Sequence, residues 1–374
     1  MARYDTAVIG VGIVGASAVY ALAQAGARVL ALDAGAAGAG TSSNSFAWVN
    51  SVNKEPEVYH RLNADGMTAH RRLVRELGGE AGYHEGGSLE WAEAGEEHAL
   101  RARVERLRRW GYPARWICRD DALGMEGGLT IPTDVPEVVL YEADGWLDAP
   151  RLIRRLLAAA SARGAEVRER TPVRSLRRRG DRVEALVTDA GEVHADSVLL
   201  CVGPTTQAFL DPLGVTIPIG RVAGLLAVTS RPAHALGRVV HAPGIHLRPD
   251  ASGGLLLGAR DVDPRITDTT APARASEIAA VLLERAARVF APARDVRLAE
   301  CRIGVRPMPA DNQTVAGRIP GFTNAWMLAT HSGVTLGPLL GHLIASEITG
   351  GSPSATLAPF RPERFGTVEA GTSR

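Results

Sequence analysis

The first 33 residues follow the hydrophobic pattern of a strand, a turn, a helix and a second strand. Residues 6–9 are an apolar run between Asp5 and Gly10, and residues 13–25 are rich in Ala, Val and Leu before Gly26. Residues 28–32 form another apolar run, which ends at Asp33. Short apolar runs on both sides of a proline-free helical segment predict a buried parallel βαβ unit.

The turn of this unit carries three spaced glycines, Gly10, Gly12 and Gly15. The first glycine allows a tight turn, the second lets the backbone approach a pyrophosphate, and the third lets the helix pack against the strand. Free N–H groups at the helix N-terminus favour the anion, and Asp33 can accept hydrogen bonds from ribose hydroxyls. The unit therefore predicts a dinucleotide site for NAD or FAD.

The small polar loop over residues 35–45 has two interpretations. Its glycines, serines and threonine suit backbone contact with a ligand, but they equally suit a plain flexible connector.

The remaining pattern predicts further helices and strands, with a second buried strand far from the N-terminus. That strand, residues 198–203, also ends in glycine, so the nucleotide domain should be interrupted by insertions. Predicted helices cover residues 57–77, 96–110, 148–162, 276–290 and 336–348. Predicted strands cover residues 87–91, 173–176, 183–188 and 192–195, with alternating segments between 217 and 257.

Composition narrows the function classes. The 374 residues carry a formal net charge of +1, which gives no overall attraction to nucleic acid. No apolar run is long enough for a membrane span, and no N-terminal leader is evident. Three widely separated cysteines predict neither a disulfide framework nor a metal site, so we expect a cytoplasmic protein. The arginines of residues 96–110 alternate with glutamates, which favours a solvated helix face.

Motifs spread over nearly the whole chain resemble one family. The chain resembles the FAD-dependent amine oxidoreductases of the D-amino-acid oxidase superfamily, in the branch of glycine oxidase, sarcosine oxidase and D-amino-acid dehydrogenase. The matching segments are residues 10–15, Asp33, 40–42, 144–148, 198–203, 304–311, 331–337 and 359–365.

This resemblance implies an α/β fold (α+β in two domains), with a Rossmann-like FAD-binding domain and an inserted antiparallel-sheet substrate domain. The FAD domain is expected over residues 1–80, 145–215 and 300–374, and the substrate domain over 81–144 and 216–299. Noncovalent FAD is expected, because Gly304 stands where covalent relatives carry a cysteine. The residues expected at FAD are Gly10, Gly12, Ile13, Val14, Gly15, Asp33, Ala34, Gly40, Thr41, Ser42, Val173, Gly203, Gly304, Ser332, Gly333, Val334, Thr335 and Leu336.

The implied activity is oxidation of the C–N bond of a small amino acid or secondary amine by hydride transfer to flavin. Oxygen or another acceptor would then reoxidise the flavin. Two alternatives stay open: a 2-hydroxy-acid oxidoreductase, and a non-catalytic flavin-binding subunit. Arg306 is the expected anchor for the substrate carboxylate, since a guanidinium matches a carboxylate in bidentate fashion. Its alternative is a structural pair with Asp311.

Three other residues have both a functional and a structural interpretation. Lys54 is the only lysine of the chain and could promote oxygen reduction near flavin, or simply be exposed. Trp48 could line the substrate pocket or belong to the core. His246, with Arg248, could line the substrate cavity or cap a sheet edge.

Departures from the family pattern affect specificity. Residues 43–47 lack the histidine and arginine typical of sarcosine oxidases, which speaks against N-methylglycine as the dedicated substrate. Asn312 and Thr330 stand where relatives carry glycine.

Overall fold

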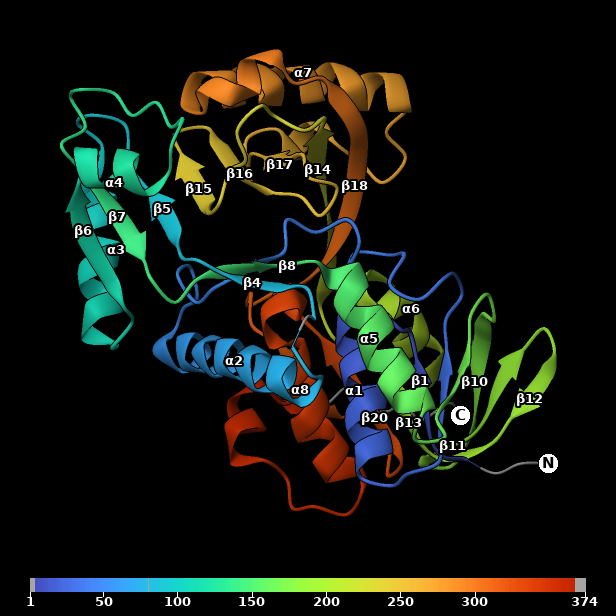
Figure 1. Cartoon of the computed structure of the whole chain (residues 1–374). Coiled ribbons are helices and arrows are strands. Elements are labelled where there is room, and N and C mark those ends of the chain that lie inside the picture. Colours follow the sequence, from blue (N-terminus) through green and yellow to red (C-terminus); the bar gives the residue numbers. More distant parts are fainter. Residues whose placement is uncertain (1–3, 80, 367–374) are drawn as a thin grey trace.

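Two large sheets organise the chain in the computed structural model, which describes residues 4–79 and 81–366 (Figure 1). The first is a six-stranded sheet in the order β19-β20-β13-β1-β2-β9, parallel except for β19. Its strands are β1 (Tyr4–Ile9), β2 (Val29–Leu32), β9 (Glu166–Arg168), β13 (Ala195–Leu200), β19 (Val315–Arg318) and β20 (Ala325–Ala329). The predicted βαβ unit is therefore present, with β13 as the returning buried strand.

Helices cover one face of this sheet and a small antiparallel sheet covers the other (Figure 1). The helices are α1 (Ile13–Gln24), α2 (Glu57–Glu76), α5 (Ala149–Ser161) and α8 (Gly333–Ile348). The small sheet consists of β10 (Val173–Arg179), β11 (Arg182–Thr188) and β12 (Gly191–Val193). Leu176 and Leu186 of the small sheet pack against Ile9 and Leu200, so both faces of the parallel strands are buried.

The second large sheet has eight strands in the order β18-β14-β17-β16-β15-β5-β7-β6. These are β5 (Ser88–Glu90), β6 (Ala114–Cys118), β7 (Glu137–Tyr141), β14 (Ile219–Thr229), β15 (Val239–Ala242), β16 (Ile245–Pro249), β17 (Leu255–Gly258) and β18 (Leu298–Pro309). Helix α7 (Pro272–Val289) packs on one face, where Leu247, Leu257 and Leu282 share a core (Figure 1). Helix α7 leaves the opposite face of the eight-stranded sheet uncovered, so that face is available to line a binding site.

Shorter elements connect the two sheets. A third small sheet joins β3 (Trp48–Val49), β8 (Gly145–Leu147) and β4 (Tyr83–Glu85). The remaining helices are α3 (Glu97–Arg109), α4 (Arg119–Met125) and α6 (Thr206–Leu210). Single 3₁₀ turns are η1 (Gly203–Thr205), η2 (Asp211–Leu213), η3 (Asp263–Arg265), η4 (Ala291–Asp295), η5 (Ala355–Phe360) and η6 (Pro362–Phe365).

The predicted fold class is confirmed, with two differences in detail. The substrate-side sheet is not purely antiparallel, because β15 pairs in parallel with β5 and so joins its two sequence pieces. The predicted domain boundary at residue 300 also falls inside β18, which pairs with β14 from Leu298 to Pro309. Arg306 therefore lies on the eight-stranded sheet, since β18 continues that sheet before the chain returns to β19.

Candidate functional site

One cavity of about 1080 Å³ extends from the ends of the parallel strands to the open face of the eight-stranded sheet. The βαβ turn, the loop over residues 38–48 and the N-terminus of α8 line its first part. Strands β14, β16 and β18 line the other part. An elongated cavity between a nucleotide-type sheet and a separate sheet suits a dinucleotide at one end and a small substrate at the other.

Backbone geometry at the βαβ turn fits a pyrophosphate. Gly10 has a φ of +89°, and a Cβ atom there would lie 2.4 Å from the carbonyl oxygen of Cys201. Helix α1 begins after Gly12 with no side-chain cap and no acidic residue in its first turn. Its positive end therefore opens into the cavity with no acidic side chain in the helix's own first turn to neutralise it. Gly12, Ile13 and Val14 line the cavity here.

Asp33 lies at the end of β2 and faces the same cavity. Its Oδ2 accepts a hydrogen bond from the N–H of Val11 at 2.7 Å, and its Oδ1 accepts from the N–H of Gly35 at 2.9 Å. Each carboxylate oxygen keeps a further acceptor position, because an ionised carboxylate accepts about four hydrogen bonds. A fixed Asp33 with spare acceptor capacity suits the two hydroxyls of a ribose.

The polar loop after Asp33 is part of the cavity wall, so the connector interpretation is insufficient. Ala34, Gly40, Thr41 and Ser42 line the cavity. The Oγ of Ser42 accepts from the N–H of Ile13 at 2.9 Å, which holds the loop against the first turn of α1.

Val173 and Gly203 also line the cavity, whereas Gly15 lies behind the wall. A Cβ atom on Gly15 would lie 2.0 Å from the carbonyl oxygen of Gly10. Gly15 therefore permits the close contact of α1 with the turn, and its contribution to any cofactor is indirect.

Gly304 lines the cavity where β18 meets the loop over residues 38–48. A Cβ atom on Gly304 would lie 2.2 Å from the carbonyl oxygen of Asn44. A cysteine at this position would need the loop to move. The local packing thus fits noncovalent FAD.

Helix α8 presents a second uncapped N-terminus to the cavity. Gly333 and Val334 line the cavity, whereas Ser332, Thr335 and Leu336 are buried behind it. The hydroxyl of Thr335 lies 3.5 Å from the carbonyl oxygen of Trp48, and the Oγ of Ser332 accepts from the hydroxyl of Tyr59. The three buried residues therefore hold the helix end in place rather than facing a ligand with their side chains.

Arg306 reaches the cavity from β18 and pairs with a carboxylate that the sequence had not indicated. Its Nη2 donates to Asp263 at 2.5 Å and to the carbonyl oxygen of Ala223 at 3.2 Å. The pair lies over Gly224, because a Cβ atom there would come within 2.9 Å of both side chains. Asp311 instead pairs with Arg364, so the predicted structural pair of Arg306 with Asp311 is wrong. The Nε of Arg306 is buried without a protein partner.

Lys54 lies beside this group but does not itself line the cavity. Its Nζ is 3.3 Å from the Nε2 of His331, which does line it. Burial, with a smaller contribution from the charge of Arg260, lowers the pKa of Lys54 to about 8. Burial also lowers the pKa of His331 to about 3, so His331 is neutral. A neutral His331 that accepts at Nε2 carries its proton on Nδ1, a buried donor without a protein partner.

Trp48 and His246 both line the cavity. The ring of His241 lies between them: its centroid is 4.0 Å from that of Trp48, and its Nδ1 is 2.9 Å from the Nδ1 of His246. The indole N–H of Trp48 donates to Asp144 at 2.9 Å, so this wall of the cavity is anchored to a buried carboxylate.

Burial raises the pKa of Asp144 to about 7 despite hydrogen bonds from Trp48, Ser88 and Tyr112. The side chain is fully buried. The hydrogen bonds from Ser88 and Tyr112 hold the Asp144 carboxyl group in place, and Asp144 in turn holds the indole of Trp48.

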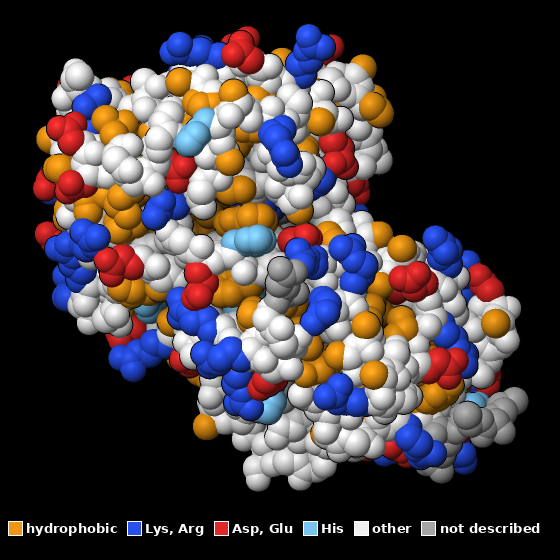
Figure 2. All heavy atoms as spheres, viewed as in Figure 1, with side chains coloured by type: hydrophobic (Ala, Val, Ile, Leu, Met, Phe, Trp, Pro, Cys, Tyr) orange, Lys and Arg blue, Asp and Glu red, His pale blue; other side chains and the backbone are white. Residues whose placement is uncertain are grey.

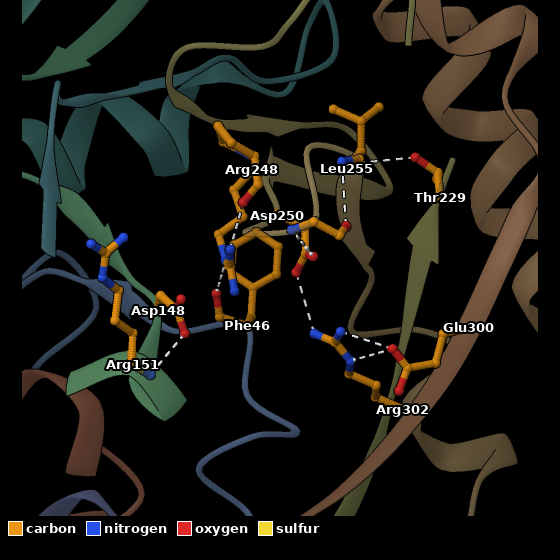
Figure 3. A network of polar contacts seen from close by, with 12 residues as sticks. Phe46, Asp148, Arg151, Thr229, Arg248, Asp250, Leu255, Glu300 and Arg302 are labelled. Carbon is orange, nitrogen blue, oxygen red and sulfur yellow. Dashed lines mark hydrogen bonds and ion pairs between the residues drawn. The ribbon is translucent and has the colours of Figure 1, made fainter. Parts of the chain in front are cut away.

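Arg248 does not line the large cavity but a second one of about 320 Å³. Figure 3 shows its guanidinium directed at the backbone of Phe46, whose carbonyl oxygen accepts from Nε. In the same network Arg302 pairs with Asp250 at 3.2 Å and with Glu300 at 2.8 Å. Arg248 therefore joins the eight-stranded sheet to the loop that separates the two cavities. This role differs from the two predicted for it, lining of the substrate cavity and capping of a sheet edge.

The two departures from glycine are accommodated locally. Asn312 adopts a left-handed conformation with a φ of +57°, which asparagine tolerates better than most residues. The Oγ1 of Thr330 accepts from the N–H of Ser332 at 3.0 Å and from the hydroxyl of Thr314 at 2.9 Å. Neither substitution blocks the cavity.

The face shown in Figure 2 carries basic and acidic side chains interspersed, in keeping with the net charge of +1. No helix in the described part of the chain is both long and apolar enough to cross a membrane. Within residues 4–79 and 81–366, no three His, Cys, Asp or Glu side chains form a group that could hold a metal ion.

A βαβ unit that feeds one end of a long cavity, with a separate sheet closing the other end, defines a two-domain enzyme built around a dinucleotide cofactor. Residues 5–347 match the family of FAD dependent oxidoreductases, and the chain belongs to that family. FAD is therefore its cofactor, and the predicted membership of the D-amino-acid oxidase superfamily is confirmed.

Known proteins similar to this chain include amino-acid and opine oxidases. An opine oxidase component from Agrobacterium tumefaciens is 27% identical, covering 99% of this chain and 100% of its own. Glycine oxidase of Pseudomonas aeruginosa is 27% identical, covering 95% and 97%. The crystal structure of glycine oxidase from Geobacillus kaustophilus superposes with a TM-score of 0.85 at 25% identity, covering 99% and 100%.

Proposed function

We propose that this enzyme oxidises the C–N bond of a small amino acid or secondary amine that carries a carboxylate. The observation that carries this proposal is the donor set at the substrate end of the cavity. Arg306 lines the cavity with 39% of its side chain exposed, and its hydrogen bonds to Asp263 and to the carbonyl oxygen of Ala223 both use Nη2, which leaves Nη1 to donate to a ligand. An accessible guanidinium edge in a cavity wall is a strong attractor for a carboxylate.

FAD, when bound, accepts two electrons and a hydrogen from the carbon next to the nitrogen. The residues of this chain bind and orient the substrate: Arg306 holds the carboxylate, and the wall of Trp48, His241 and His246 restricts the rest of it. Burial lowers the pKa values of both histidines, so both are neutral at pH 7 and only weak bases toward the substrate. Orientation and exclusion of water are then the main contributions of the protein.

We further propose that Lys54 acts on the oxidative half of the cycle. Its ammonium group is held behind His331, where a positive charge favours reduction of oxygen or another acceptor near the cofactor. The three cysteines are free thiols, which fits the cytoplasm as the compartment.

The Arg306 assignment is tested with Arg306→Gln, assayed for binding of carboxylate ligands and for anaerobic flavin reduction. We expect retained FAD colour and a loss of carboxylate affinity of roughly 10- to 100-fold, the scale of a charge-assisted hydrogen bond. Unchanged affinity and reduction rate would refute the role.

Asp263→Asn is the matched control. It frees Arg306 from its counter-charge, so carboxylate affinity should rise or hold while it falls in Arg306→Gln. If the pair is only structural, both variants lose stability and neither changes carboxylate affinity.

One observation favours a second candidate, a flavin-binding subunit that works with other chains. The relative from Agrobacterium tumefaciens is named as one subunit of its oxidase, and it aligns with 99% of this chain. Purified chain that binds FAD but leaves it oxidised with every amine and 2-hydroxy acid would support that candidate.

A further inference from the structure

The second cavity, of about 320 Å³, lies on the other side of the loop that lines the large one. Ser42, Asn44, Ser45 and Ala47 of this loop line both cavities. The remaining walls come from β8, the first turn of α5, the end of β16 with the turn after it, and the start of β18. Most of the lining residues are polar or charged, so the cavity suits a small polar ligand.

Arg248 is the unusual member of this wall. It is only 4% exposed, yet it forms no ion pair with a carboxylate of any described residue. Its guanidinium lies over the ring of Trp146, 4.8 Å from the centroid. The Nε donates to the carbonyl oxygen of Phe46, and Nη1 donates to that of Pro249 at 2.5 Å. Among the described residues Nη2 has no acceptor, so it is free to donate to an occupant of the cavity.

The second arginine of this wall, Arg302, differs because both of its Nη atoms are paired (Figure 3). Its Nη1 lies 3.2 Å from Asp250 and its Nη2 lies 2.8 Å from Glu300. Arg302 therefore already supplies the counter-charge of these two carboxylates. The cation without a partner on this wall is Arg248.

Asp148 is the carboxylate of this wall that lacks a cation. Its Oδ1 accepts from the N–H of Arg151 and caps helix α5, whereas Oδ2 accepts from no described residue. Burial lowers the pKa of Arg248 to about 10, while the charges of Asp250 and Asp148 act in the opposite direction. Arg248 is therefore charged at neutral pH. Asp148 lies near enough to influence it without pairing with it.

A buried cation and a carboxylate that face one cavity without touching are both left incompletely satisfied. Such charges are costly unless another group supplies the missing partners. A ligand with an anionic and a cationic group a short distance apart would satisfy both. An α-amino acid has this form, because its nitrogen and its carboxyl carbon are about 2.5 Å apart on one carbon.

We infer that the second cavity binds a free α-amino acid as a zwitterion, with its carboxylate on Arg248 and its ammonium group on Asp148. This ligand is not the substrate that is oxidised. The cavity is lined neither by the glycine turn before α1 nor by the N-terminus of α8, the two segments expected to hold the cofactor. The inference therefore goes beyond the proposed function and does not depend on it.

The occupant would lie close to the wall of the large cavity. Arg248 holds the backbone of Phe46, and the ring of Phe46 lines the large cavity with its centroid 6.2 Å from that of His246. A ligand on Nη2 would therefore be joined through one side chain to the residue that separates the two cavities.

Three small probes test the binding claim. L-alanine carries both charges, propionate lacks the ammonium group, and ethylamine lacks the carboxylate. Each is titrated into the FAD-loaded Arg306→Gln variant, which removes the carboxylate anchor of the large cavity, and binding is followed by saturation-transfer NMR of the probe. We expect L-alanine to bind about 10-fold tighter than either other probe, the scale of one further charge-assisted contact at a partly solvated site.

Two substitutions added to this variant separate the two contacts. Arg248→Gln should weaken L-alanine and propionate about 10-fold and leave ethylamine unchanged. Asp148→Asn should weaken L-alanine and ethylamine by a similar factor and leave propionate unchanged. Asparagine caps a helix as well as aspartate does, so Asp148→Asn decides the question even if Arg248→Gln does not fold.

Glu300→Gln is the matched control, because its carboxylate lies on the same wall but is already paired with Arg302. It should change the affinity of none of the three probes. Equal affinity for all three probes before these substitutions overturns the inference. Unchanged L-alanine affinity in Asp148→Asn, or an equal loss in Glu300→Gln, overturns it as well.

Discussion

Replacing Lys54 by methionine should stabilise the protein at neutral pH, because the ammonium group is held where water reaches it poorly. The pKa of Lys54 falls from its ordinary 10.5 to about 8. That difference corresponds to about 3 kcal/mol against folding when the lysine is charged. Lys54 keeps some solvent contact, so we expect about 2 to 3 kcal/mol in favour of Lys54→Met at pH 7.

The sign of the pH dependence follows from the depressed pKa. The folded state binds the Lys54 proton less tightly than the unfolded state, so the penalty is complete below about pH 8 and fades toward pH 10.5. The melting temperature of the FAD-loaded variant should therefore exceed that of the native protein by roughly 4 °C at pH 7. The difference should shrink to about half at pH 9.5.

Lys54→Arg is the control, since arginine stays charged throughout this range. Its melting temperature should differ from that of Lys54→Met by an amount that does not change with pH. A Lys54→Met protein that melts at or below the native temperature at pH 7 would refute the reasoning. A difference that does not shrink as pH rises would refute it equally.

Three further substitutions test the site and its supports. Asp33→Ala should weaken FAD binding by roughly 10- to 100-fold, measured by flavin fluorescence on titration, and unchanged affinity would contradict its role. Gly304→Ala should lower the melting temperature because its Cβ meets Asn44 at 2.2 Å, whereas Gly220→Ala, at 3.4 Å from its nearest neighbour, should be tolerated. The native protein should lose stability as pH rises from about 4 to 7, because burial raises the pKa of Asp144 in the folded state to about 7. Asp144→Asn should remove this loss, and an unchanged pH profile of the melting temperature would contradict the prediction.

Local sequence patterns predicted the elements that carry the cofactor. The βαβ unit needs only neighbouring residues: apolar strands, glycines at fixed spacing and an acid at the next strand end. Helices α2, α3 and α5 appear within one or two residues of their predicted bounds, because each buries one apolar stripe. Strands β6 and β7 were missed, since short segments on a mixed sheet carry little periodic signal.

The substrate end could not be predicted in the same way. Arg306 was named from the family resemblance, but its pairing with Asp263 depends on the register between β14 and β18 and on the 3₁₀ turn after β17. Arg260 and His241 lie in the cavity because β17, β15 and β18 share one sheet. No spacing along the chain encodes that neighbourhood. His331 did have a signal, as part of the segment before α8 that was already expected at the flavin.

We propose that this FAD enzyme oxidises carboxylate-bearing amines in the cavity that Arg306 lines. The most direct measurement mixes the FAD-loaded enzyme anaerobically with D-, L- and N-methyl amino acids, iminodiacetate and the matching 2-hydroxy acids, and follows the visible flavin absorbance. We predict that at least one carboxylate-bearing amine bleaches the flavin, and that Arg306→Gln slows this reduction. Flavin that stays oxidised with every amine, or that is bleached by 2-hydroxy acids alone, would contradict the proposed amine oxidation.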